Sequence, residues 1–75
     1  MSSKPPLLPA HQIVKAFERF GFSQISQRDS HIKMYNPSSE KTIIIPAHRE
    51  VDRWTLKGIL RDADISVEEF LKHVK

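Results

Sequence analysis

The 75-residue chain contains no cysteine, two glycines and no long hydrophobic run. Without cysteine it forms no disulfide, no thiolate zinc site and no thiol nucleophile. With Gly21 and Gly58 as its two glycines, it has no glycine-rich loop that could cradle a phosphate. It has no apolar run near the roughly 18 residues of a spanning helix. Its N-terminal stretch also lacks the apolar region of a secretory signal. We therefore expect a cytoplasmic protein that does not bind a membrane.

Charge is distributed unevenly along the chain. Lysine and arginine number 12 against 9 aspartates and glutamates, a net charge of +3. Residues 28–61 carry seven cations and four anions, whereas residues 62–75 carry two cations and four anions. A basic centre favours an anionic partner such as nucleic acid, although the same excess is common on proteins that bind nothing charged.

The hydrophobic spacing predicts one small α+β domain over residues 9–75, preceded by a disordered or extended arm over residues 1–8. Apolar residues recur at helical spacing from Pro9, and Gly21 suits the left-handed position that ends a helix. Turn residues are predicted at Arg28-Asp29 and again after Tyr35. Three short strands are expected around these turns, over residues 22–27, 30–35 and 42–46.

Helical periodicity returns after the third predicted strand. Asp52 is a candidate N-cap for a helix that ends near Asp64, and Ser66 with Glu69 forms a capping box for a last helix. His73 is expected in the last turn of that helix. The predicted order is one helix, a three-stranded antiparallel sheet and two helices, with the helices packed on one face of the sheet.

Histidine is the side chain that changes charge most readily near neutral pH, and His31 is the strongest candidate for chemistry. Strand alternation puts it on the same face as Lys33 and Tyr35, away from the core. An imidazole beside a cation and a phenol could handle a phosphodiester as base or acid, charge clamp and stacking surface. A histidine on an open sheet face is nevertheless more often simply solvated. His48, beside Arg49, could meet a phosphate or be plain surface.

The second predicted helix offers a cationic edge. Arg53, Lys57 and Arg61 recur every four residues over about 12 Å, which suits phosphate contacts, although a solvated helix face gives the same pattern. Trp54 either stacks on a base or partner, or caps the core. The histidines have no metal-ligand spacing, so we expect neither a metal nor another cofactor.

Four segments, in this order and spacing, resemble the HicA (YcfA-like) toxins. They are Gly21-Phe22, Asp29-Ser30-His31, Ile45-Pro46-Ala47-His48 and the run from Thr55 to Phe70. The resemblance implies a fold similar to a double-stranded-RNA-binding domain. It also implies a ribosome-independent mRNA interferase that is silenced by a HicB antitoxin. The family's active histidine matches His31. Asp29, Trp54 and Asp64 stand where the family usually has glycine.

The expected function is therefore RNA cleavage by metal-independent acid–base catalysis at His31, in a toxin with mRNA and a HicB-like antitoxin as partners. Possible accessory residues are His48, Tyr35 and Ser30. The basic residues expected to bind RNA are Arg28, Lys33, Arg53, Lys57 and Arg61. A non-catalytic RNA-binding module with the same fold is the main alternative, and a small protein-interaction module is the third.

Overall fold

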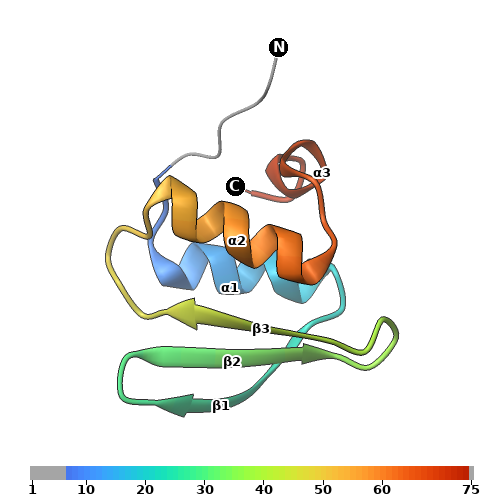
Figure 1. Ribbon diagram of the computed structural model, residues 1–75, viewed down its shortest axis with the longest axis horizontal. Coiled ribbons are helices and arrows are strands. Elements are labelled where there is room, and N and C mark those ends of the chain that lie inside the picture. The colour runs from blue at the N-terminus through green and yellow to red at the C-terminus, as the bar shows by residue number, and fades with distance from the viewer. Residues whose placement is uncertain (1–6, 75) are drawn as a thin grey trace.

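The computed structural model describes residues 7–74. Its elements are α1 (Ala10–Arg19), β1 (Ser23–Arg28), β2 (His31–Asn36), β3 (Lys41–Pro46), α2 (Arg53–Ala63) and α3 (Val67–Leu71). The strands form one layer, and all the helices lie on the same side of it (Figure 1). This arrangement confirms the expected α+β fold, which is similar to a double-stranded-RNA-binding domain.

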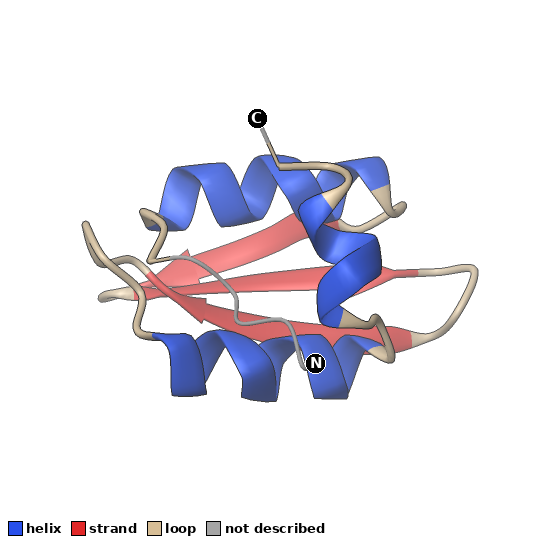
Figure 2. Ribbon diagram, turned by 90° about the horizontal axis from the view of Figure 1, so that it is seen from above, coloured by secondary structure: helices blue, strands red, loops and turns tan. Residues whose placement is uncertain are grey.

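The sheet is an antiparallel meander in the order β1-β2-β3. Seen from above, α1 and α2 run along the two opposite edges of this sheet (Figure 2). On β2, Ile32 and Met34 are buried beneath the helices, whereas His31 and Lys33 are exposed on the other face. Helices therefore cover one face of the sheet and leave the other open to solvent.

Helix α1 ends at the glycine that the sequence indicates. Gly21 has a φ of +97°, a left-handed conformation that costs a residue without Cβ little. The backbone N–H of Phe22 donates to the Phe17 carbonyl at 3.1 Å, and that of Gly21 donates to the Glu18 carbonyl at 3.1 Å. These are the two hydrogen bonds of a Schellman motif. The Phe22 ring packs against Phe17 with centroids 5.4 Å apart, so the end of α1 also anchors the start of β1.

The one buried polar side chain among the described residues joins α1 to the sheet. Asn36 is 7% exposed at the end of β2. Its Nδ2 donates to the Phe20 carbonyl at 3.0 Å, and its Oδ1 accepts from the Ser38 backbone N–H at 2.9 Å. The amide thus satisfies both of its polar ends while it fixes the turn into β3.

Helix α2 begins at its predicted cap. The Asp52 carboxylate accepts from the Thr55 backbone N–H and from its hydroxyl, both at 2.8 Å. The backbone hydrogen bond is the main cause that lowers the pKa of Asp52 below its usual value. Helix α3 is capped by the Ser66 hydroxyl but ends at Leu71. The prediction that His73 lies in its last turn is therefore wrong: the His73 ring packs edge-on against Phe20, with centroids 4.6 Å apart.

Several predicted boundaries differ from the structure: β1 and β2 each begin and end one residue later than expected, and β3 begins one residue earlier. Leu8, which we expected in the arm, is 8% exposed and pairs with Val51, whose backbone N–H donates to the Leu8 carbonyl at 2.8 Å. Residues 1–6 of that arm lie outside the described residues. Arg28, expected in a turn, is the last residue of β1, and Asp29 with Ser30 forms the turn instead. Within residues 7–74, no helix is long and apolar enough to cross a bilayer.

Candidate nucleic-acid interface

The open face of the sheet is built by the alternation of β2. Residues 31 and 33 are exposed because their neighbours in the strand, Ile32 and Met34, point into the core. Across the sheet, His31 is paired with Arg28 of β1 and with Pro46 of β3. Side chains of paired residues point to the same face of a sheet. His31 therefore has a cation beside it on β1 and Lys33 two residues along its own strand.

Tyr35 is on the same face but not close to His31. It is half-buried and paired with Thr42, at the far end of β2. At about 3.3 Å per residue, the Cα atoms of residues 31 and 35 are about 13 Å apart. The structure does not bring the phenol to the imidazole.

The turn that leads into His31 contains an aspartate in a left-handed conformation. Asp29 has a φ of +54°, and Asp64 at the end of α2 has a φ of +60°. Both are left-handed positions, which aspartate tolerates better than most residues with a Cβ. These are two of the three positions where the family that the sequence resembles usually has glycine. The substitutions therefore preserve the turn before His31 and the end of α2.

His48 lies at the same end of the sheet, in the segment that leaves β3. Its backbone N–H donates to the Pro46 carbonyl at 2.9 Å, and its own carbonyl accepts from the Ala10 N–H at 3.0 Å. The chain thus bends from the sheet edge towards the start of α1. Because Pro46 is the partner of His31, His48 is two residues from the position opposite the candidate catalytic residue. Ser30 flanks His31 directly, and its carbonyl accepts from the Ala47 N–H at 2.7 Å.

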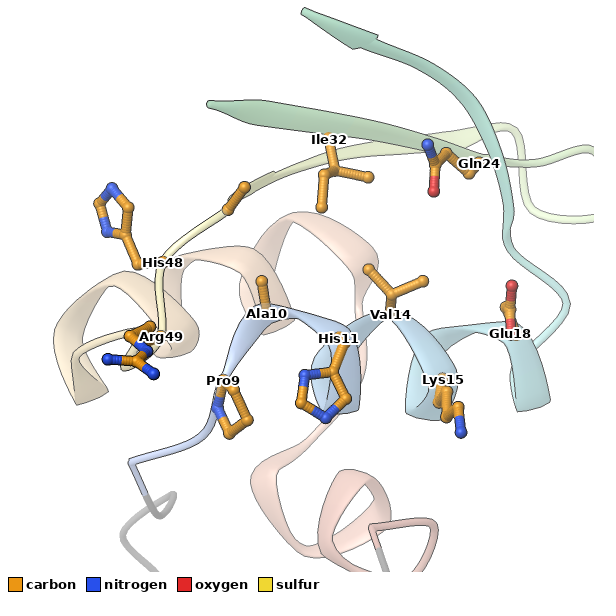
Figure 3. Close-up of a pocket in the computed structure, with 11 residues that line it drawn as sticks. Pro9, Ala10, His11, Val14, Lys15, Glu18, Gln24, Ile32, His48 and Arg49 are labelled. Atoms are coloured by element: carbon orange, nitrogen blue, oxygen red, sulfur yellow. The ribbon is translucent and has the colours of Figure 1, made fainter. Parts of the chain in front are cut away.

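An apolar groove of about 680 Å³ runs between α1 and the sheet on the helix-covered face. Figure 3 shows Ile32 and Val14 facing each other across it, with His11 and Lys15 along α1 and the ring of His48 directed away from His11. No pattern in the sequence indicates this groove. Its walls come from four separate segments, namely α1, β1, β2 and the segment after β3, and no local spacing pattern connects them. His48 therefore lines the groove and also lies two residues beyond Pro46, the strand partner of His31.

The cations of α2 belong to a different layer from His31. Arg53, Lys57 and Arg61 are exposed on the helix, which packs over β3 on the covered face of the sheet. Trp54 is 81% exposed, so the possibility that it caps the core is excluded. The Lys57 Nζ lies 5.3 Å from the centroid of the Trp54 ring, a cation–π contact.

Among residues 7–74, no three histidine, cysteine, aspartate or glutamate side chains cluster in a way that could hold a metal ion. What the open face offers is an exposed imidazole between an arginine and a lysine. Such a group can exchange protons with a bound molecule and attract an anion.

Comparison with known families gives one match. Residues 10–65 match the family model of the HicA toxin of bacterial toxin–antitoxin systems. The matched segment extends from the start of α1 to just beyond α2, and it includes the turn before His31 and the segment around His48. No curated protein sequence matches the chain.

Proposed function

Because the chain belongs to the HicA toxin family, we propose that it is the mRNA-cleaving toxin of a toxin–antitoxin pair and that His31 is its catalytic residue. The observation that carries the proposal is the exposure of His31 on the open face, paired with Arg28 and two residues from Lys33. The family implies a cognate antitoxin. We propose a HicB-like protein that covers this face and so blocks access to His31.

In the proposed reaction, His31 accepts the proton of a ribose 2′-OH. The freed oxygen attacks the adjacent phosphorus in line, and the bond from phosphorus to the 5′-oxygen breaks. The products are a 2′,3′-cyclic phosphate and a 5′-hydroxyl, once the leaving oxygen has taken a proton. His31 could instead supply that proton. General acid–base catalysis of this kind contributes about 10²- to 10⁴-fold to a rate.

The second proton-transfer group is best sought near His31. Ser30 precedes it, and His48 follows its strand partner Pro46 by two residues. Tyr35 is too far along β2 to reach the same phosphate, and a stacking contact with a base suits it better. We therefore favour His48 over Tyr35 as the group that protonates the leaving oxygen.

The basic residues would hold the RNA backbone. Arg28 and Lys33 flank His31 and would offset the charge that develops on the phosphate. The cations of α2 would contact phosphates farther along the RNA; these cations are Arg53, Lys57 and Arg61. Such contacts carry no base information, so they support cleavage of many sequences.

The test is cleavage of labelled single-stranded RNA by purified protein. The wild type should shorten the RNA, and His31→Ala should lower the rate by about 10²- to 10⁴-fold. His11→Ala, which removes an exposed histidine from α1, is the matched control and should cleave normally. EDTA should leave the rate unchanged, because the proposed step moves protons alone. Cleavage by His31→Ala at the wild-type rate would overturn the assignment.

A non-catalytic RNA-binding module with the same fold is the second candidate. Within residues 7–74, no hydrogen bond orients the His31 imidazole, whereas catalytic bases are commonly held by a partner group. The same assay separates the two functions. RNA that is retarded on a native gel but stays intact would favour the binding module.

A further inference from the structure

The outward side of α2 carries a tryptophan that the fold does not use. Trp54 is 81% exposed in the first turn of the helix, although it is the only tryptophan in the chain. A large aromatic side chain left in water contributes none of the hydrophobic stabilisation that its burial would give. Packing therefore does not account for the residue at this position.

Two cations stand on the same side of the helix as Trp54. Residues 54, 57 and 61 are spaced at i, i+3 and i+7, which puts Trp54, Lys57 and Arg61 on one side of α2 over about 10 Å. The opposite side packs in the core. Its buried residues are Leu56, Ile59, Leu60 and Ala63. We call the exposed side, formed by Trp54, Lys57, Gly58 and Arg61, the outer ridge of α2.

Gly58 places no side chain over the indole, whose ring already has the Lys57 ammonium 5.3 Å from its centroid. Glycine inside a helix is destabilising relative to alanine, and a Cβ at position 58 would meet no atom within 4 Å. Packing therefore does not require a glycine here. Because helical side chains tilt towards the N-terminus, a longer side chain at position 58 would lie over the turn that carries Trp54. Glycine leaves that ring accessible.

We propose that the outer ridge of α2 is a stacking site for a base of single-stranded RNA, with Lys57 and Arg61 holding the adjacent phosphates. Every base has a face that can stack on an indole, and nearby cations suit the polyanionic backbone. The ridge has two cations, and the exposed Asp62 flanks it one turn after Gly58, so cations outnumber acidic side chains there and favour an anionic ligand.

The position of the ridge would allow an RNA strand bound at His31 to reach Trp54. The start of α2 and the start of β2 lie at the same end of the molecule, and residues 47–52 connect that end of the sheet to α2 (Figure 1). RNA leaving His31 around Pro46 would therefore reach Trp54 before Arg61. The inference rests on the proposed function for its ligand, but binding to the ridge requires no cleavage.

The fluorescence of Trp54 tests the proposal directly, because the chain has no other tryptophan. The probe is a single-stranded 2′-O-methyl RNA, which lacks the 2′-hydroxyl that cleavage needs. Its titration should quench the fluorescence in a saturable manner. Trp54→Ala should weaken binding by about 5- to 150-fold, measured by the anisotropy of labelled RNA. Trp54→Phe should restore part of the affinity.

A second pair of variants separates the ridge from a structural role. Gly58→Gln should raise the thermal midpoint, because it removes a helical glycine, and should weaken RNA binding, because it covers the indole. Gly58→Ala is the matched comparison: it should raise the midpoint but, with a side chain too short to reach the ring, weaken RNA binding less than Gly58→Gln does. A structural role alone would not join greater stability to weaker binding.

Four results separate failure of the ridge from failure of the proposed nuclease. RNA binding without a change in Trp54 fluorescence, or with normal affinity in Trp54→Ala, would overturn the proposal. Quenching by poly-glutamate equal to that by RNA would also overturn it and assign the ridge to an acidic protein. Quenching by the 2′-O-methyl RNA without cleavage of ordinary RNA would support the ridge and refute the nuclease.

Discussion

The two faces of β2 differ in burial and in chemical character, because helices cover one face and solvent covers the other. Met34 is fully buried beneath the helices, whereas the adjacent Lys33 stands in solvent with His31. A single strand therefore supplies the core with one set of side chains and a candidate catalytic surface with the other. The open face contributes little to the core, so its residues can change chemistry at small cost to folding.

The largest expected effect is on the covered face. Met34→Ala should lower the free energy of unfolding by about 2–5 kcal/mol, because it leaves a cavity in the centre of the sheet. Urea denaturation measures this change. Lys33→Ala, one residue away, is the matched control and should leave stability within about 0.5 kcal/mol. It should instead reduce the salt dependence of RNA binding by about one charge. Equal losses of stability would contradict the division between the faces.

Asn36 tests whether a polar residue on the covered face serves the fold. Asn36→Ala should lower the free energy of unfolding by about 1–3 kcal/mol, because the Phe20 carbonyl and the Ser38 N–H lose their partners. Thermal and urea unfolding would measure the loss. Ser38→Ala keeps the backbone N–H and should be nearly neutral. A neutral Asn36→Ala would show that water replaces both hydrogen bonds.

Asp52, at the N-cap of α2, makes the stability of the protein depend on acid. Since the pKa of Asp52 is lowered by folding, its contribution is complete at neutral pH. The contribution is lost as the pH falls from the ordinary aspartate range through the lowered pKa. Asp52→Asn still accepts from the Thr55 N–H but cannot titrate. The free energy of unfolding, measured from pH 7 to pH 2, should fall less in this variant than in the wild type. Identical pH profiles would contradict the claim that the ionised Asp52 cap stabilises the fold.

The smallest effect is expected at the turn before His31. Asp29→Gly should raise the free energy of unfolding by less than about 1 kcal/mol, because glycine adopts the left-handed φ of +54° without strain. Asp62→Gly, inside α2, should lower it by a similar amount. Chemical denaturation of the two variants compares them. The same replacement of aspartate by glycine should therefore raise the free energy of unfolding at position 29 and lower it at position 62. If both variants are less stable than the wild type, the Asp29 side chain stabilises the turn.

The elements that local rules govern were predicted best. The end of α1 at Gly21 and the cap of α2 at Asp52 each depend on one residue with a specific hydrogen-bonding or φ preference. The alternation of β2 similarly indicated the exposure of His31. The burial of Leu8 could not be predicted, because it depends on pairing with Val51, more than forty residues away.

The candidate site shows the same limit. The exposure of His31 follows from the strand alone, but its separation from Tyr35 and its nearness to Pro46 depend on strand length and on register between strands. The groove beside His48 combines side chains from α1, the sheet and the segment after β3. Trp54 was ambiguous in the sequence, because an aromatic residue next to an apolar stripe can face either way.

Growth of cells that express the protein tests the central claim most directly. Expression of the wild type should arrest growth, and His31→Ala, produced at the same level and with the same thermal midpoint, should allow normal growth. His11→Ala should still arrest it. Arrest by a folded His31→Ala protein would contradict the claim that the open face of β2 carries the toxic activity.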